Sequence, residues 1–286
     1  MTSANPTLLK YPRTPHLEGS PLQAGDEGDQ HVAYRHLHGR TIVVEEKLDG
    51  ANCGLSFSDG GELLLQSRGH YLAGGGRERQ FNLFKRWAVA QEAVLLERLQ
   101  ERYILYGEFM HKKHSVFYDC LPHLFHEFDI YDRRQGHFLS TAARMALLGS
   151  APVLSVPVLY AGPAPRHLRD LLVLIGPSYA KTRNWRTRFE SVVQREGFDL
   201  SKAWAMVDKS DHMEGLYIKV EQGGRVVERY KWVRRDFVQT ILDAGQHHST
   251  QPYIPNQLFD GVDIFAPQLT HTWLDLGVPR LEIPAW

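Results

Sequence analysis

Short β-branched runs separated by turn residues occupy the middle of the chain, and they constrain its fold more than any other feature. Thr41–Lys47 is one such run, Gly50 permits a turn, and residues 52–57 can return as a second strand. The Asp59-Gly60-Gly61 turn precedes a third strand at Leu63–Ser67. Further runs of this kind cover residues 103–109, 124–131, 215–221 and 225–233. The pattern predicts twisted, mostly antiparallel sheets.

Other stretches have helical spacing. Residues 78–101 place apolar side chains at helical intervals, and Ser140 is a capping residue ahead of a short helix ending at Leu148. Residues 165–208 also have mostly helical character. We therefore expect an α+β fold with inserted helices. Its expected organisation is a lead-in at 1–40 packed on the core, a main domain at 41–236, and a small C-terminal extension at 237–286.

Composition narrows the class of protein. Lys+Arg and Asp+Glu both number 33, so any surface for nucleic acid must be a local patch. Two cysteines cannot form a disulfide framework, and no apolar run is long enough to cross a membrane. The N-terminus lacks the apolar core of a signal peptide. These observations favour a cytoplasmic protein with no membrane partner.

The sharpest local feature is the run Glu46-Lys47-Leu48-Asp49-Gly50, at the end of the first strand. A lysine can act as a nucleophile only when neutral, which requires burial or neighbouring positive charge to lower its pKa. K-x-D-G alone is a weak signal, since about one chain in twenty of this length should contain it by accident. An exposed lysine before a β-turn is the alternative reading of the isolated tetrapeptide.

Further motifs follow Lys47 and Asn52 in a fixed order. They are Ser67-Arg68-Gly69, Tyr106-Gly107-Glu108-Phe109, Phe125-His126-Glu127-Phe128-Asp129-Ile130, Glu214-Gly215-Leu216-Tyr217-Ile218-Lys219 and Arg229-Tyr230-Lys231-Trp232. Over about residues 41–235 this series resembles the covalent nucleotidyltransferase superfamily of ligases and capping enzymes. Within it, the chain is most similar to RNA ligases of the nick-sealing and RNA-editing type. Each motif is short, but six in the right order make a specific signal.

The resemblance implies a nucleotidyltransferase (ATP-grasp-like ligase) fold with a short C-terminal extension. It also implies an ATP-dependent RNA ligase that joins a 5′-phosphate to a 3′-hydroxyl end through lysyl-AMP and adenylylated RNA. Its cofactors would be ATP and Mg²⁺ or Mn²⁺, and its partners RNA ends. An end-healing kinase or phosphatase would be a compatible further partner, although no residue indicates one.

The resemblance also assigns residues to the nucleotide. Lys47 matches the lysine that accepts AMP, and Asn52 matches an asparagine five residues later. Arg68 matches the arginine that approaches the ribose and phosphate. Phe128 matches the ring that stacks on adenine, where a plain core role is the alternative. Glu46 is a candidate for reading adenine or, alternatively, a solvated strand edge.

A second group is expected to handle cation and phosphate. Glu108 matches an acid that meets the ribose or the metal, and Glu214 matches the acid that organises the divalent cation. Asp49 is expected to contact the ribose, position Lys47 or bind metal. Lys231 and Arg229 occupy the last motif, where Arg229 replaces a usual lysine. Arginine still binds phosphate but cannot exchange a proton, so Lys231 is the stronger candidate.

The alternation of side chains along a strand provides a prediction that does not depend on the family resemblance. With Gly223-Gly224 as the turn, Ile218 should face Arg229 and Leu216 should face Lys231. Glu214 would then share their face. Lys219 would fall on the opposite face unless a bulge intervenes.

Competing functions remain open at this stage. A DNA ligase or a capping guanylyltransferase has similar motifs but normally carries an oligonucleotide-binding barrel, for which the fifty or so residues after Lys231 are few. An inactive nucleotide- or RNA-binding module is the second alternative. A zinc site at Cys120, His123 and His126 is disfavoured, because only one cysteine lies nearby. Basic residues at 112–113, 181–188 and 234–235 are candidates for contacting an RNA backbone, or simply solvated faces.

Overall fold

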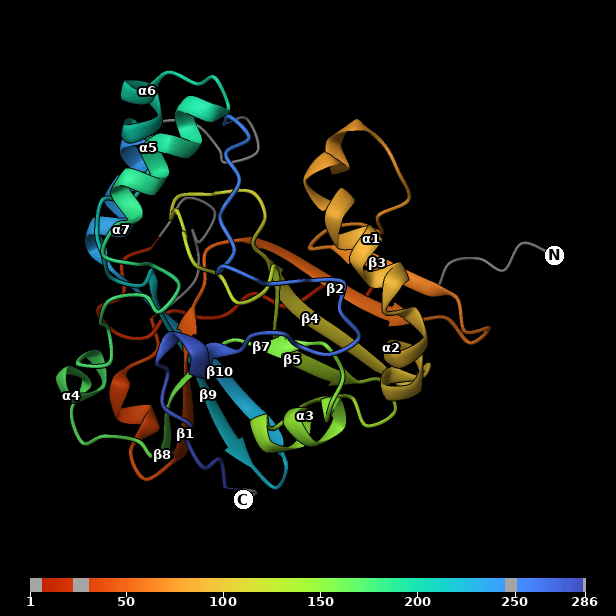
Figure 1. The fold of residues 1–286 in the computed structure, drawn as a ribbon. Coiled ribbons are helices and arrows are strands. Elements are labelled where there is room, and N and C mark those ends of the chain that lie inside the picture. The colour runs from red at the N-terminus through yellow and green to blue at the C-terminus, as the bar shows by residue number, and fades with distance from the viewer. Residues whose placement is uncertain (1–6, 23–30, 245–250, 285–286) are drawn as a thin grey trace.

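The computed structural model describes residues 7–22, 31–244 and 251–284. Within these residues the strands join into one mixed sheet that is almost entirely antiparallel, in the order β3-β2-β4-β5-β6-β10-β9-β1-β8, with β7 beside β5 in parallel (Figure 1). The expected α+β class with a mostly antiparallel sheet is confirmed. The strand bounds are β1 Thr41–Lys47, β2 Ala51–Phe57, β3 Leu63–Ser67, β4 Tyr103–Phe109, β5 Phe125–Asp132, β6 His137–Leu139, β7 Leu154–Ser155, β8 Val158–Pro163, β9 Gly215–Gln222 and β10 Arg225–Val233.

The first two strands do not pair with each other, although they are consecutive in the chain. β1 pairs with β8 and β9, whereas β2 pairs with β3 and β4, so the expectation that residues 52–57 return beside β1 is wrong. The link Leu48–Gly50 instead carries the chain from one part of the sheet to another. A Cβ on Gly50 would lie 2.6 Å from Met110 Sδ and 3.0 Å from the Phe109 carbonyl oxygen. Gly50 is therefore needed for close approach, and not for a positive φ.

The β9–β10 hairpin turns at Gly223-Gly224 as expected, but its register corrects the parity prediction. A bulge at Val227 shifts the pairing, so that Arg229 faces Lys219 and Lys231 faces Tyr217. Lys219 is therefore on the same face as both cations, whereas Leu216 and Ile218 point the other way. A one-residue shift moves every side chain to the opposite face. The sequence that precedes Val227 does not predict this bulge.

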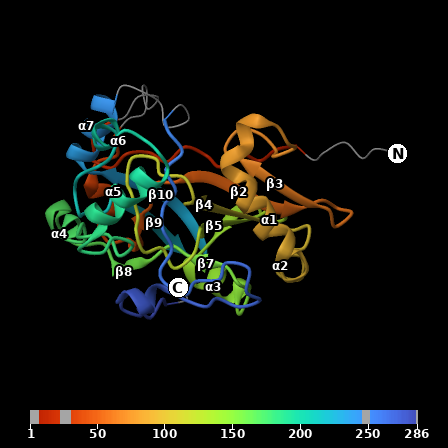
Figure 2. The ribbon, with the colours of Figure 1, turned by 45° about the horizontal axis from the view of Figure 1, so that its top comes forward.

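The helices cover the two ends of this sheet. α1 and α2 lie beside β2–β4, and α5, α6 and α7 gather at the opposite end in both views (Figures 1 and 2). The single helix expected at 78–101 is divided by Gln91, whose side-chain amide donates to the Phe265 and Ala266 carbonyls. The helix bounds are α1 Asn82–Ala90, α2 Glu92–Leu99, α3 Thr141–Leu148, α4 Leu168–Leu172, α5 Trp185–Arg195, α6 Leu200–Ala205 and α7 Arg235–Ala244, with 3₁₀ turns Tyr34–Leu37, Gly76–Phe81 and Trp273–Leu276. Ser140 caps α3 as expected, since its hydroxyl accepts from the Ala143 amide.

The described tail packs across the rest of the chain. Its apolar residues Ile264, Trp273 and Val278 belong to the same core as β2, β4 and β5. The Trp273 indole donates to the Ser155 carbonyl oxygen at 2.8 Å. Among residues 251–284 the chain forms isolated bridges and one 3₁₀ turn, but no extended strand. No helix in the described ranges has the length and apolar character needed to cross a membrane.

Candidate active site around Lys47

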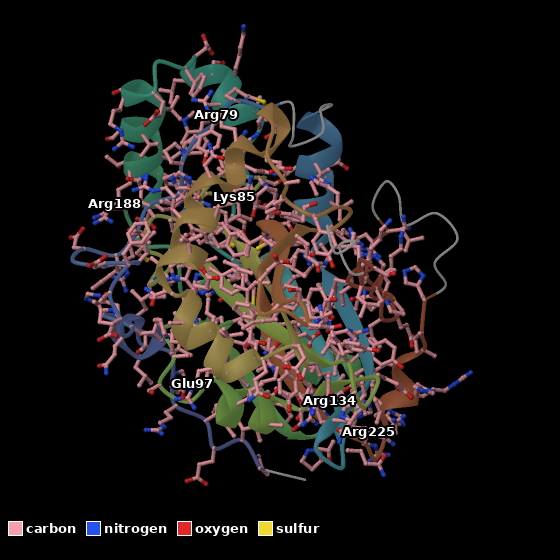
Figure 3. The ribbon with its side chains drawn as sticks, turned by 90° about the vertical axis from the view of Figure 1, so that its right-hand side faces the viewer. Arg79, Lys85, Glu97, Arg134, Arg188 and Arg225 are labelled. Atoms are coloured by element: carbon pink, nitrogen blue, oxygen red, sulfur yellow. The ribbon has the colours of Figure 1, made fainter. Side chains whose placement is uncertain are left out.

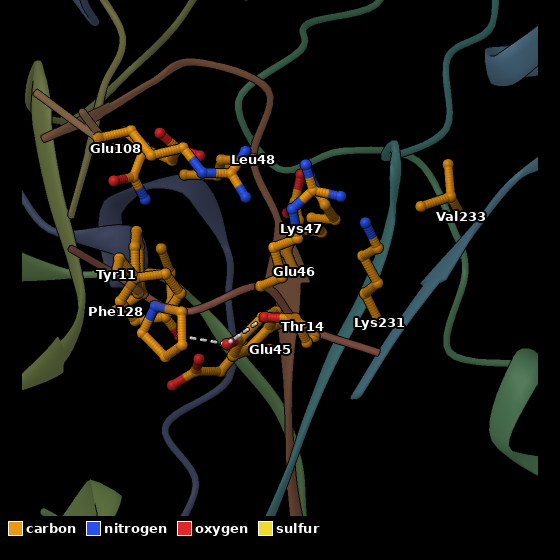
Figure 4. Close-up of a pocket in the computed structure, with 16 residues that line it drawn as sticks. Tyr11, Thr14, Glu45, Glu46, Lys47, Leu48, Glu108, Phe128, Lys231 and Val233 are labelled. Atoms are coloured by element: carbon orange, nitrogen blue, oxygen red, sulfur yellow. Dashed lines mark hydrogen bonds between the residues drawn. The ribbon is translucent and has the colours of Figure 1, made fainter. Parts of the chain in front are cut away.

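A cavity of about 310 Å³ lies where the chain passes from β1 to β2. This volume is at the lower end of the range for small-molecule sites. Lys47, the last residue of β1, lines it, and Figure 4 shows Lys47 and Glu46 between Phe128 and Tyr11 on one side and Lys231 on the other. We call this cavity the Lys47 pocket. It is lined by Tyr11, Pro12, Arg13, Thr14, Glu45, Glu46, Lys47, Leu48, Asn52, Arg68, Glu108, Phe128, Val156, Tyr217, Lys231 and Val233.

Glu214 holds the Lys47 ammonium. Lys47 Nζ lies 2.7 Å from Glu214 Oε1, and the Glu214 side chain is only 3% exposed. Burial lowers the pKa of Lys47, but Glu214, Glu108 and Asp49 raise it by more, so its pKa lies above the ordinary value. Lys47 is therefore charged in this state. Its use as a nucleophile requires the neighbouring carboxylates to be neutralised.

The acids of the site have unusually high pKa values. Burial, with a contribution from Glu214, raises the pKa of Glu108 to about 8 even though Lys47 lowers it. Burial likewise raises the pKa of Glu214 to about 7. Glu108 Oε2 is buried and has no hydrogen-bond partner among the described residues. A carboxyl oxygen without a partner, next to a second carboxyl group, is suited to binding a divalent cation or a ligand hydroxyl.

Glu46 also lines the pocket, and the Ser178 hydroxyl donates a hydrogen bond to its carboxylate. Burial raises the pKa of Glu46 to about 7, against the lowering effect of Ser178 and of the Tyr179 backbone. Its Oε2 is also buried without a partner in the described chain. Glu46 is therefore not the solvated strand edge that was the alternative for it. A carboxyl that is partly neutral near pH 7 can donate or accept a hydrogen bond.

Two aromatic rings border the pocket. Phe128 is 9% exposed and its centroid lies 6.3 Å from that of Tyr217. Tyr11 packs edge-on against Phe128 at 5.0 Å. Phe128 is thus both part of the core and a wall of the pocket. An apolar aromatic surface of this kind suits a flat base.

The structure brings most of the expected residues together. Asn52 and Glu108 are paired neighbours on β2 and β4, and both line the pocket. Arg68 reaches it from the end of β3, and Lys231 from β10. Arg68, Lys231 and Asn52 thus line the same cavity as Lys47, which is an arrangement suited to an anionic ligand.

Three expected residues lie outside the pocket lining, namely Asp49, Arg229 and Glu214, although Glu214 contacts Lys47. Asp49 Oδ2 accepts hydrogen bonds from the Ser115 and Val116 amides, both at 2.7 Å, so its carboxylate anchors the loop after β4. Arg229 lies beneath the pocket, with its guanidinium 3.4 Å from Asp129 Oδ2 and 3.9 Å from the Phe138 ring centroid. Stacking on a ring is a task that suits the planar guanidinium better than an ammonium.

A buried charge cluster lies beneath the pocket. It consists of Glu45, Glu127, Asp129, Arg144 and Lys219, whose side chains are all 0% exposed. Arg144 bridges Glu45 and Glu127, and Lys219 Nζ lies 2.8 Å from Glu45 Oε2 and 3.1 Å from Asp129 Oδ1. Lys219 also donates to the Phe128 carbonyl. The cluster thus fixes β1, β5 and β9 directly under the pocket floor.

Sequence reasoning missed the residues that come from the lead-in. Tyr11, Pro12, Arg13 and Thr14 line the pocket because this segment lies along β10. The lead-in has no periodic pattern of residues, so its local sequence does not predict where it lies in the fold. The Tyr11-Pro12-Arg13-Thr14 run, with its aromatic, cationic and hydroxyl side chains, was the only signal available.

Several of the other basic candidates have partners within the protein. Lys112 and Lys113 are buried, and Lys113 donates to the His114 and Met206 carbonyls. Arg234 is buried against Asp208, Arg186 pairs with Asp211, and Arg188 donates to the Asp119 carbonyl. Among the described residues no group of three or more His, Cys, Asp or Glu side chains is placed to hold a metal.

Comparison with known proteins places this geometry in a family. A search of curated proteins returned no match. Among solved structures, Naegleria gruberi RNA ligase is similar in fold. A lysine-to-alanine mutant with ATP and Mn gives a TM-score of 0.52 at 18% identity, covering 83% of this chain and 60% of that one. A glutamate-to-alanine mutant with AMP and Mn gives 0.53 at 17% identity, with the same coverage.

This chain spans between about half and three fifths of the length of those chains. The family model for RNA ligase matches residues 40–233, from just before β1 to the end of β10. That span contains the lysine, the acids and the cations described above. The chain belongs to the RNA ligase family.

Proposed function

We propose that the protein is an ATP-dependent RNA ligase that joins a 5′-phosphate to a 3′-hydroxyl RNA end through lysyl-AMP. The observation that carries the proposal is the placement of Lys47 in a pocket lined by two acids with high pKa values, Glu46 and Glu108, by aromatic rings and by cationic side chains. These are the parts that nucleotidyl transfer to a lysine requires.

The first step forms a bond between Lys47 Nζ and the α-phosphorus of ATP. The bond from that phosphorus to the bridging oxygen breaks, and pyrophosphate leaves with the electron pair. Next, an oxygen of the RNA 5′-phosphate attacks the same phosphorus and releases Lys47, giving adenylylated RNA. Finally the 3′-hydroxyl attacks the 5′-phosphorus, the RNA ends are joined and AMP leaves.

The residues divide these tasks by position. Phe128 holds adenine by stacking, with Glu46 at the base edge, and Asn52 and Arg68 contact the sugar and phosphate. Lys231 stabilises charge on the α-phosphate. Arg229 and Asp49 act indirectly, Arg229 by supporting Asp129 beneath Phe128 and Asp49 by holding the loop at Ser115.

The acids fit a divalent cation. Glu108 and Glu214 would hold Mg²⁺ or Mn²⁺, with the remaining ligands supplied by water and phosphate, as is usual for Mg²⁺. When bound there, the cation offsets two carboxylates beside Lys47, which lowers the pKa of the lysine, and screens charge on the phosphate. Before attack, Lys47 Nζ must lose its proton and its contact with Glu214.

The match to the family model for RNA ligase supports the substrate assignment. RNA ends are the proposed partners, the cytoplasm is the proposed location, and an end-healing kinase or phosphatase is compatible with the need for 5′-phosphate and 3′-hydroxyl ends. A DNA ligase and a capping guanylyltransferase remain the alternatives to be tested. The first differs in the acceptor and the second in the nucleotide.

The decisive experiment incubates the purified protein with α-labelled ATP or GTP and Mg²⁺ or Mn²⁺, followed by a denaturing gel. We expect an acid-labile label from ATP only, and its loss in Lys47→Ala, by at least about a thousandfold. Lys113→Ala would be a poor control because Lys113 is buried, so the matched control is Lys10→Ala on the surface. No label from folded, AMP-free protein would refute the mechanism.

The acceptor is then identified with the labelled protein. Nicked RNA, nicked DNA and single-stranded RNA, each with a 5′-phosphate, are offered in parallel. Transfer to RNA and sealing support the proposed activity. Transfer to DNA alone, or a label from GTP, would replace it with one of the alternatives.

A further inference from the structure

We propose that Arg13, in the lead-in before β1, is a phosphate-binding residue of the Lys47 pocket. The proposal rests on the proposed function of that pocket and adds a residue outside the span that the family model matches, residues 40–233. Arg13 lines the cavity and is exposed to it. Its ligand is a phosphate group, either of the ATP polyphosphate or of the RNA 5′ end.

The lead-in passes directly beside Lys231. The Lys231 amide donates to the Pro15 carbonyl at 2.9 Å, and the Leu17 amide donates to the Lys231 carbonyl at 2.9 Å. This short parallel bridge fixes the backbone two residues after Arg13 against β10. Arg13 and Lys231 therefore approach the pocket from adjacent segments, although 218 positions separate them in the sequence.

The residues on each side of Arg13 are also held. Tyr11 and Thr14 are each 8% exposed, and Thr14 Oγ1 hydrogen-bonds with the Tyr217 hydroxyl at 3.1 Å. Tyr11 hydrogen-bonds to Asp129 and Tyr217, and its ring packs on Tyr106 at 5.2 Å. The backbone that carries Arg13 is thus ordered before any ligand arrives. Less entropy is then lost when its side chain binds.

The charge of the pocket favours an anion. Four cationic side chains line it, namely Arg13, Lys47, Arg68 and Lys231, against Glu45, Glu46 and Glu108. Glu45 is already paired with Arg144 and Lys219 in the buried charge cluster. Lys47 is paired with Glu214, which lies outside the lining. The other three cations come from separate segments of the chain to one cavity, which is an arrangement suited to phosphate oxygens.

Arginine is suited to this task. Its planar guanidinium can donate two parallel hydrogen bonds to phosphate oxygens, whereas the Lys231 ammonium acts as a point charge. Arg13 and Arg68 line the pocket from two different segments, the lead-in and the residue directly after β3. Together with Lys231 they would bind the polyphosphate of ATP or the 5′-phosphate of RNA from three separate segments.

The test compares Arg13→Ala and Arg13→Lys with Lys10→Ala, which removes an exposed cation of the same segment that does not line the pocket. One arm measures the rate of lysyl-AMP formation against ATP concentration. The other mixes preformed lysyl-AMP enzyme with nicked RNA bearing a 5′-phosphate. We expect Arg13→Ala to weaken one of these steps by about ten- to a hundredfold, with partial recovery in Arg13→Lys and none of the loss in Lys10→Ala.

The two kinetic measurements distinguish which phosphate group Arg13 binds. A higher KM for ATP with normal transfer assigns Arg13 to the polyphosphate, and slow transfer with normal adenylylation assigns it to the RNA 5′ end. Unchanged kinetics in both arms, with Lys47→Ala still inactive, would overturn this proposal alone. Thermal unfolding of each variant separates a folding defect from a binding defect.

A failure of the proposed function would look different. If wild type forms no lysyl-AMP, calorimetry with ATP and with inorganic triphosphate still measures the contribution of Arg13. Weaker binding in Arg13→Ala than in Lys10→Ala then supports a phosphate site without ligation. Equal affinities in wild type and Arg13→Ala, or no binding by wild type, would refute it.

Discussion

The Lys47 pocket and the buried charge cluster beneath it contain the same kinds of side chain, yet they differ in how their charges are matched. In the cluster, burial raises the pKa of Asp129, but Lys219, Arg229 and Arg144 lower it by more, so its pKa lies below the ordinary value. In the pocket, the pKa values of Glu46 and Glu108 rise to about 7 and about 8. Buried charged groups that have partners indicate a structural role, whereas buried acids without partners indicate a site for a ligand.

The comparison has one exception within the cluster. Burial raises the pKa of Glu127 despite the neighbouring Arg144 and Lys219. Glu127 nevertheless has partners for both oxygens, since Arg144 donates to Oε1 at 2.7 Å and Ser155 to Oε2 at 2.6 Å. In the cluster, Glu45 Oε2 and Asp129 Oδ1 also lack a hydrogen bond, but Lys219 Nζ lies 2.8 Å and 3.1 Å from them. Among the described residues, Glu108 Oε2 and Glu46 Oε2 have neither a hydrogen bond nor an ion pair, and this distinguishes them from the cluster acids.

Breaking the cluster should have the largest effect, and on stability. Arg144→Met leaves Glu45 and Glu127 buried without their common partner, so we expect a loss of about 3–5 kcal/mol in the free energy of unfolding. Chemical denaturation measures it. The matched control is Arg134→Met, because Arg134 is 61% exposed and pairs with Glu101; its position is labelled in Figure 3. A loss no larger than that of the control would show that the cluster is not a scaffold.

Changing an acid of the pocket should affect activity instead. Glu108→Gln keeps the shape but removes a carboxylate beside Lys47, so we expect lysyl-AMP formation to slow by on the order of a hundredfold. The stability should stay the same or rise. Single-turnover labelling with ATP measures the rate, and Glu97→Gln on the exposed face of α2 is the control, visible in Figure 3. A destabilised variant with normal chemistry would reverse the comparison.

The smallest effect concerns pH. Because the folded pKa of Glu46 is about 7 and its unfolded pKa is near 4.5, the folded state keeps a proton that the unfolded state loses. Ionising Glu46 therefore costs stability as pH rises from about 4.5 to 7, at most about 3 kcal/mol. Glu46→Gln should flatten the fall in stability over this window. Unfolding of wild type, Glu46→Gln and Glu97→Gln at several pH values measures it, and parallel curves would contradict the shift.

Much of the fold follows from local sequence. β4 and β10 occupy residues 103–109 and 225–233, the same ranges that their β-branched and aromatic residues predict. The Gly223-Gly224 turn and the Ser140 cap also depend on short-range chemistry. The short strands β6, β7 and β8 were not predicted, because runs of three and two residues, or a run interrupted by Gly162, carry little periodic signal.

The order of the motifs identified residues of which most line one cavity, but the contacts among them needed the tertiary structure. The sequence by itself determined that Lys47 ends a strand, that Phe128 and Glu108 lie on others, and that the series is similar to that of RNA ligases. It could not determine that the Val227 bulge turns Lys219 inward, or that Tyr11 and Arg13 lie beside Lys231. Strand identity depends on neighbours in the chain, whereas sheet register and the path of an aperiodic segment depend on contacts between residues far apart in sequence.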